Sequence, residues 1–255
     1  FDAAAGFGGR RESGFGREGG TEGLYAYLKP DRVQLALKPI SAFEANDSLS
    51  SEINTIDRTA KNYIGGKQKR PDGNYSRAVY SAKGSLIGHV GEGNRKDIRD
   101  AVEAAHKASS WANTSGHLKA QILYYWAENL SARSQEFTQR LIKVTGCSEI
   151  VASAEVEASL SALFKAAAWA DKYDGAVHNV PIRGVALAMN EPMGVIGMAC
   201  SSAQPLLGFI SLVAPAIAMG NVCIVVPSEP YPLLATDLYQ VLETSDLPGG
   251  VINIV

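Results

Sequence analysis

Hydrophobic side chains between residues 94 and 173 recur three and four positions apart, which places them on one face of an α-helix. Asn94 is a residue type that begins helices, and Gly146 is one that ends them. The pattern predicts three or four amphipathic helices in succession over residues 94–173. The positions that carry it include Ile98, Val102, Ala105, Leu118, Ile122, Leu123, Trp126, Leu130, Phe137, Leu141, Val144, Leu160, Leu163, Phe164 and Ala167.

The hydrophobic period changes after residue 175. Residues 177–180 and 185–189 are short runs of strand-forming residues, with Pro181 and Gly184 between them. Two such runs around a turn are typical of a β-hairpin. We expect a hairpin over residues 177–190, outside the main core.

Residues 193–255 alternate strand-like and helix-like runs. This βαβαβ order predicts right-handed crossovers and a parallel sheet covered on both faces, which is half of a dinucleotide-binding fold. The predicted fold class is α/β, with N-terminal helices and a partial Rossmann-like sheet. The expected strands are 194–200, 222–226 and 251–255, and the expected helices are 206–219 and 233–243.

Residues 192–228 contain no charged side chain, and more than about 18 apolar residues in a row can span a membrane. Pro205, Pro215 and Gly220 divide this stretch into a short strand-like run, a helix-length run and another short run. Strands that are buried on both faces are also continuously apolar. We therefore favour a buried core over a membrane span.

Composition narrows the class of protein. With 46% hydrophobic and 20% charged residues, the 255-residue chain can form a sizeable core. The net charge of -2 provides no general attraction for nucleic acid or an anionic membrane. The three cysteines form no CxxC pair and the four histidines no cluster, so we expect no metal site and a reducing, cytoplasmic location.

A literal GxGxxG motif runs from Gly14 to Gly19. A phosphate-binding loop of this kind needs a strand before it and a helix after it, whereas here further glycines flank the motif. We therefore reject it as a phosphate site. Residues 24–37 are compatible with an edge strand, and residues 41–60 are polar, as in a linker.

Short motifs along the chain follow the order and spacing of a known family. The first set is Phe7-Gly8-Gly9, Ser13-Gly14-Phe15-Gly16-Arg17-Glu18 and Gly23-Leu24. The second set is Glu92-Gly93, Asp171-Lys172-Tyr173-Asp174-Gly175, Glu191-Pro192-Met193-Gly194-Val195, Ala214-Pro215-Ala216, Gly220-Asn221, Pro227-Ser228-Glu229 and Leu247-Pro248-Gly249-Gly250-Val251. The first resembles the end of an aldehyde dehydrogenase domain, and the second resembles the first part of another.

The resemblance to the aldehyde dehydrogenase superfamily implies a domain organisation. Residues 1–37 are expected to be the C-terminal tail of a preceding domain, 38–61 a linker, and 62–255 the N-terminal part of a second domain. Such a junction is similar to the tandem-domain family 16 type. Because the chain opens at Phe1 without a methionine and stops on an apolar run, we expect a truncated sequence.

The resemblance also shows two departures from the family pattern. The family places an asparagine that polarises the aldehyde oxygen where this sequence has Ala203, and a lysine that binds the adenosine ribose where it has Val226. Losing one oxyanion donor typically lowers the rate by about 10²- to 10³-fold. Losing a hydrogen bond to a charged group lowers affinity by about ten- to a hundred-fold.

The cofactor implied by the resemblance is NAD or NADP, and Val226 makes its binding by this chain doubtful. The cofactor-binding residues carried over are Ser228 and Glu229. An alternative explanation for Glu229 is an acid at the N-terminus of the next helix, stabilised by the helix dipole. The amides that start the helix near Leu206 are a second, generic place for an anion.

We expect no catalytic residue in this chain, because the family's nucleophilic cysteine and general-base glutamate lie beyond the position that matches Val255. Cys200 and Cys223 lie in apolar strands and are predicted to be inert, whereas Cys147 follows a helix end and is the most reactive candidate.

Two other groups of residues have ordinary explanations. Ser201 and Ser202 lack the GxSxG context of a nucleophilic serine. Trp111, Trp126 and Trp169 lie at helix-compatible positions and are predicted to pack in the core.

Three functional hypotheses follow. The first is a non-catalytic module used in assembly, as a homo-oligomer or with a partner protein. The second is part of an active NAD-dependent aldehyde dehydrogenase that oxidises a small aldehyde to a carboxylic acid through its other domain. The third is that the isolated chain does not fold, because its parallel sheet stops after the third strand with an apolar edge.

Overall fold

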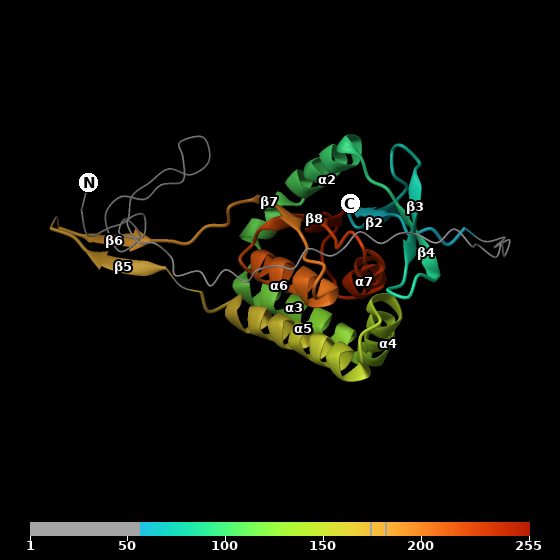
Figure 1. Cartoon of the computed structure of the whole chain (residues 1–255). Helices are drawn as coiled ribbons and strands as arrows, with labels where there is room; N and C mark the ends of the chain where they lie inside the picture. Colours follow the sequence, from blue (N-terminus) through green and yellow to red (C-terminus); the bar gives the residue numbers. More distant parts are fainter. Residues whose placement is uncertain (1–56, 174, 182) are drawn as a thin grey trace, which may run out of the picture. The chain divides into compact units, whose positions relative to one another are not determined.

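The computed structural model describes residues 57–173, 175–181 and 183–255. They belong to two units, one containing residues 173–191 and the other containing residues 57–172 and 192–255. The predictions for residues 1–37, and for the linker up to residue 56, lie outside the described residues. Figure 1 shows the elements of both units.

The helical region contains four α-helices and a short 3-10 helix among the described residues. Asn94 caps the first helix through the backbone amides of Lys96 and Asp97. Gly146 ends another helix with φ 71°, a conformation that glycine adopts without strain. The elements are α2 (Arg95–Lys107), η3 (Ser109–Asn113), α3 (Gly116–Ala132), α4 (Ser134–Thr145) and α5 (Glu149–Trp169).

The predicted βαβαβ unit is present with bounds close to those expected. Its three strands are parallel, with Val195 opposite Val222 and Cys223 opposite Ile252. The uncharged stretch is thus strand, helix and strand within one core. The elements are β7 (Val195–Ala199), α6 (Pro205–Ala218), β8 (Val222–Val226), α7 (Leu233–Glu243) and β9 (Ile252–Ile254).

The expectation of an open edge after the third strand is wrong for β9, while β7 ends the strand order among the described residues. A hairpin of β1 (Asn62–Ile64) and β2 (Lys67–Lys69) adds to the sheet there, through the antiparallel pair Tyr63 and Ile254. The strand order is β2-β1-β9-β8-β7. We did not predict this hairpin, because a three-residue strand gives almost no period and its partner is about 190 residues away in sequence.

A second small sheet precedes the helices. It pairs β3 (Ser76–Tyr80) with β4 (Leu86–Gly91), and neither strand was predicted. Ala60, near the end of the expected linker, also bonds to this sheet, since its amide donates to the carbonyl of His89 over 3.0 Å. The last linker residues are therefore held against folded structure.

Helices cover the large sheet on both sides. In Figure 1, α2 lies above the strands, and α6, α3 and α5 lie below them. Trp111 and Trp126 are buried as predicted, but Trp169 is 52% exposed at the end of α5, so that part of the prediction is wrong. A tryptophan on the last turn of a helix has fewer neighbours to cover it. No helix among the described residues is long and apolar enough to cross a membrane.

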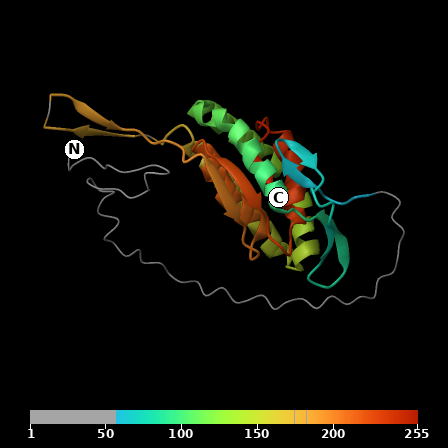
Figure 2. The same ribbon diagram turned by 90° about the horizontal axis from the view of Figure 1, so that it is seen from above.

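The hairpin expected at 177–190 consists of β5 (Ala176–Asn179) and β6 (Val185–Ala188), which pair antiparallel. Its apolar side chains are exposed, including Val177, Val185, Leu187 and Met189. Figure 2 shows the same elements from above. Exposed apolar residues grouped on one short hairpin are typical of a surface that another element covers.

Candidate functional site

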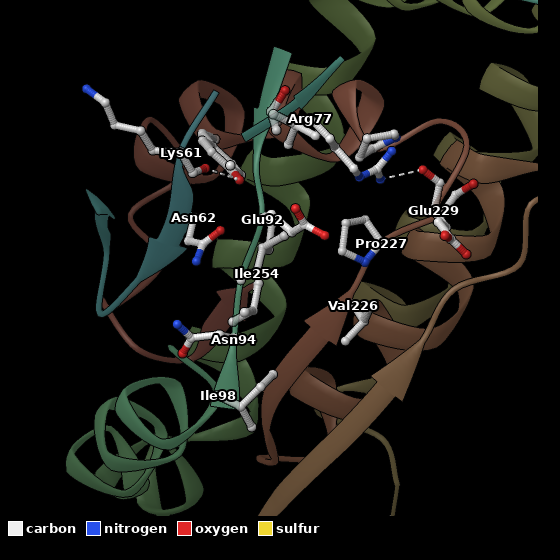
Figure 3. A pocket seen from close by; sticks show the side chains of 18 residues that line it. Lys61, Asn62, Arg77, Glu92, Asn94, Ile98, Val226, Pro227, Glu229 and Ile254 are labelled. Carbon is white, nitrogen blue, oxygen red and sulfur yellow. Dashed lines mark hydrogen bonds between the residues drawn. The ribbon is translucent and has the colours of Figure 1, made fainter. Parts of the chain in front are cut away.

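A pocket of about 390 Å³ lies at the carboxyl ends of β8 and β9. In α/β sheets this edge is where ligands bind, because helix starts and loops gather there. One wall comes from Val226 to Glu229, directly after β8, and from α7. The opposite wall comes from β1, β3 and the turn before α2 (Figure 3), through Lys61, Asn62, Arg77, Glu92, Gly93 and Asn94.

The pocket brings together the residues that the sequence singled out at the end of β8. Val226 is 46% exposed and lines the pocket, so this wall carries an apolar side chain at the end of β8. Ser228 is buried, and its hydroxyl donates to the Ser202 hydroxyl over 3.3 Å. This bond ties the loop after β8 to the loop after β7.

Glu229 lies in the loop before α7, and its exposed side chain lines the pocket. The helix begins at Leu233 and has no acidic residue in its first turn. The helix-dipole explanation for Glu229 is therefore wrong, since a charge outside the first turn gains little from the dipole. The backbone of Glu229 is held from across the pocket, because Arg77 Nη2 donates to its carbonyl oxygen over 2.6 Å.

Asn62 contributes a buried polar group to the wall of the pocket. Its side chain is 4% exposed, and its Nδ2 has no hydrogen-bond partner among the described residues. This nitrogen lies beside Gly93, 3.5 Å from the point where a Cβ of that residue would stand. An unpaired buried donor costs about 1 to 3 kcal/mol, so a ligand acceptor at this wall would be favourable.

Two stacked tyrosines support the floor of the pocket. The rings of Tyr63 and Tyr239 have centroids 4.9 Å apart, and the Tyr239 hydroxyl donates to the Lys61 carbonyl over 2.8 Å. Burial, with a smaller effect of the Glu243 carboxylate, raises the pKa of Tyr63 to about 12. Burial likewise raises the pKa of Tyr239. Both phenols stay neutral near pH 7, and the Tyr239 hydroxyl acts as a structural donor.

The loop after β7 places Ala203 between two polar residues, Ser202 and Gln204. Ala203 is exposed, and its own backbone amide donates to the Ser201 hydroxyl over 3.2 Å. The site for an anion at the start of α6 is also taken, because Glu155 Oε1 accepts from the amides of Leu206 (2.9 Å) and Leu207 (3.2 Å). That generic anion-binding prediction is wrong.

Cys223 lies in β8 as expected, whereas Cys200 follows the end of β7, and the reactivity of Cys147 stays a prediction. Burial raises the pKa of the Cys200 thiol to about 11 and that of Cys223 to about 12, so both stay protonated near pH 7. Cys147 follows Gly146 and is half-buried. Among the described residues, no group of three histidine, cysteine or acidic side chains is placed to hold a metal ion.

Sequence reasoning found the β8 wall of the pocket and missed the other. Arg77 and Asn62 lie about 150 residues away from Val226 in sequence, on strands that were not predicted. The strand-forming residues Val79 and Tyr80, which follow Arg77 closely, are the signal that would have placed it on a strand. Only the fold places it beside Glu229.

Comparisons with known proteins agree with this architecture. The model of the aldehyde dehydrogenase family matches residues 69–255. An aldehyde dehydrogenase of Agaricus bisporus is 33% identical over 181 residues, which are 69% of this chain and 36% of that protein. A malonate-semialdehyde dehydrogenase of Bacillus pumilus is 32% identical over 198 residues, covering 76% of this chain and 41% of that protein.

Solved structures show the same fold. A 3,6-anhydro-L-galactose dehydrogenase in complex with NAP has a TM-score of 0.74 at 24% identity and covers 78% of this chain. An NAD-dependent aldehyde dehydrogenase from Sinorhizobium meliloti has a TM-score of 0.74 at 25% identity. This chain covers 42% and 41% of those two chains, and the tandem-domain organisation stays a prediction. With a family match over residues 69–255, the chain belongs to the aldehyde dehydrogenase family.

Proposed function

We propose that this stretch is a non-catalytic module of an aldehyde dehydrogenase polypeptide, which keeps a nucleotide pocket but does not oxidise aldehydes by itself. The observation that carries the proposal is Ala203 in the loop after β7. Ala203 has no side-chain donor, and its amide is already bonded to Ser201. A developing oxyanion needs donors that are free and aimed at it.

The thiols support the same proposal. Aldehyde oxidation by this family begins with a cysteine thiolate, and a thiol with a pKa near 11 or 12 supplies almost none near pH 7. Cys200 and Cys223 have such values. Neither is a replacement for the family nucleophile.

Assembly is the role we propose for the module. The β5–β6 hairpin exposes Val177 by 72% and Leu187 by 62%, although a short hairpin is marginally stable on its own. Covering these side chains with a second copy or a partner protein would remove apolar area from water. Sedimentation of the full chain and of a Val177→Ser, Leu187→Ser variant tests this role, and equal masses would argue against it.

The catalytic part of the proposal is tested by steady-state NADH formation with NAD and a simple aldehyde. The expected rate equals that of a blank without protein. A clearly higher rate, abolished by boiling the protein, would overturn the proposal. A zinc chelator added to the reaction excludes activity from a contaminating metalloenzyme.

A second candidate function is NAD-linked oxidation of a small aldehyde to a carboxylic acid by the other domain of a longer protein. The pocket favours it, because Ser228 and Glu229 keep the family pattern at the carboxyl end of β8. The residues present fit an adenine dinucleotide. Glu229 offers it a carboxylate acceptor, and Asn62 Nδ2 is a buried donor from which no described residue accepts. Bound NAD would supply the hydride acceptor.

Calorimetric titration with NAD tests whether the pocket binds a cofactor. We expect saturable binding that Val226→Lys strengthens, because the added cation lies in the pocket wall. If neither the native chain nor the Val226→Lys variant gives heat on titration, cofactor binding is no longer part of the proposal and assembly remains.

A further inference from the structure

Arg77 brings a positive charge to the pocket from β3, on the wall opposite β8. Its Nη2 donates to the Glu229 carbonyl over 2.6 Å, and the side chain is half-buried (Figure 3). A guanidinium carries several N–H donors in a fixed plane, and this bond uses one nitrogen. Arg77 forms no ion pair within the described part of the chain, so its other donors remain for a ligand next to Glu229.

A second observation points to a ligand in the same pocket. Asn62 Nδ2 is a donor in a side chain that is 96% buried, and no described residue accepts from it. Buried polar groups in proteins almost always have a partner. Oxygen atoms of a bound molecule are the acceptors that this wall lacks.

We propose that Arg77 replaces the cation missing at Val226 and contacts the adenosine ribose of NAD, with Asn62 as a further donor. This inference rests on the cofactor binding proposed above. A pair of neighbouring hydroxyls both donates and accepts, so it matches a pocket lined by the Arg77 guanidinium and the Glu229 carboxylate. A dianionic 2′-phosphate would face Glu92 and Glu229 as well as Arg77, so we expect NAD to bind more tightly than NADP.

The test is calorimetric titration of the full chain and its variants with NAD. Arg77→Ala is expected to weaken NAD binding by about ten- to a hundred-fold, the effect of losing a hydrogen bond from a charged group. Adding Val226→Lys to Arg77→Ala is expected to restore much of the affinity. Arg183→Ala, which removes the same charge from an exposed position in the β5–β6 turn, is expected to change nothing.

Glu229→Gln provides an independent test of where Arg77 points. Without the carboxylate, the guanidinium attracts a 2′-phosphate unopposed, so NADP affinity is expected to rise about tenfold. The same substitution in an Arg77→Ala background is expected to give no gain. A gain of equal size in both backgrounds would overturn the assignment of Arg77.

The outcomes separate the two proposals. No saturable binding of NAD by the native chain would overturn the role of Arg77 together with cofactor binding by this pocket, and would leave the assembly role standing. Equal NAD affinity for the native chain and Arg77→Ala would overturn the role of Arg77 and leave cofactor binding intact. If Arg77→Ala loses affinity and Val226→Lys restores none of it, Arg77 acts only by supporting the backbone of Glu229, and the ligand contact is wrong.

Discussion

The loops after β7 and β8 lie at the same edge of one sheet and touch through Ser202 and Ser228, but they differ in what they offer a ligand. The loop after β8 lines a pocket that also contains the Arg77 guanidinium, the Glu92 carboxylate and the unpaired Asn62 amide. The loop after β7 carries Ala203, which has no polar side chain and whose amide is already bonded. The two neighbouring strand ends therefore present different polar groups to a ligand.

Each loop is held by a distant residue. Glu155 on α5 accepts from the first amides of α6, and Arg77 on β3 holds the backbone of Glu229. The contact of Glu155 occupies two backbone donors at the start of α6, whereas the contact of Arg77 leaves other donors of its guanidinium for a ligand. Five measurements test this difference between the two strand ends and the packing that supports them.

The largest effect is expected in thiol alkylation at pH 8. With a pKa near 11, Cys200 beside the β7 loop should react about two orders of magnitude more slowly than an exposed thiol, and Cys223 more slowly still. Mass spectrometry after timed iodoacetamide treatment measures this. Unfolded protein, in which all cysteines react alike, is the control. Rapid labelling of Cys200 would show that the β7 end holds a reactive group.

Glu155→Ala is expected to lower the free energy of unfolding by about 2 to 4 kcal/mol, because two buried amides lose their acceptor. Glu155→Gln should change it much less, since both amides bond to one oxygen that glutamine retains. Urea unfolding followed by circular dichroism measures both variants. Equal losses would show that the negative charge, and not the acceptor, supports α6.

The same two proteins give a pH test. Burial raises the pKa of Glu155, and its bonds to Leu207 and Leu206 only partly oppose this. The folded chain therefore binds this proton more tightly than the unfolded chain. The stability that the protonated carboxyl contributes is complete below the unfolded pKa near 4.5 and is lost as pH rises through the raised pKa of the folded chain. The Glu155→Gln variant should lack this part of the pH dependence. Parallel curves of the free energy of unfolding against pH for the native chain and the variant would contradict this prediction.

Tyr239→Phe is expected to lower the free energy of unfolding by about 1 kcal/mol, through loss of the bond to the Lys61 carbonyl. The stacked ring contact with Tyr63 remains, so the effect should be small and local to the pocket. Thermal unfolding measures it. A loss as large as that of Glu155→Ala would mean that the pocket floor, and not the α6 cap, dominates stability.

Ala203→Asn is expected to change stability by less than about 0.5 kcal/mol, because the side chain is exposed. It should restore no aldehyde oxidation, since Cys200 and Cys223 stay protonated near pH 7. An NADH assay with the variant checks this. Activity after this single change would show that only the oxyanion donor was missing.

Most of the fold follows from local pattern. The bounds of β8 and α7 agree with those expected, because a continuous apolar run and a 3.6-residue period leave few alternatives. The strands β1 to β4 were missed, because short runs with few apolar residues gain their structure from partners far along the chain. Trp169 was misplaced for a related reason, since a helical period does not tell which helix end is covered.

The candidate site was likewise only partly predictable from the sequence. Sequence motifs alone were enough to identify Val226, Ser228, Glu229 and the change at Ala203, because these residues follow strands with a recognisable order. The bond of Arg77 to Glu229, the unpaired Asn62 and the capture of the α6 amides by Glu155 depend on packing between distant segments. Period and composition describe neighbours along the chain, whereas a pocket is made by neighbours in space.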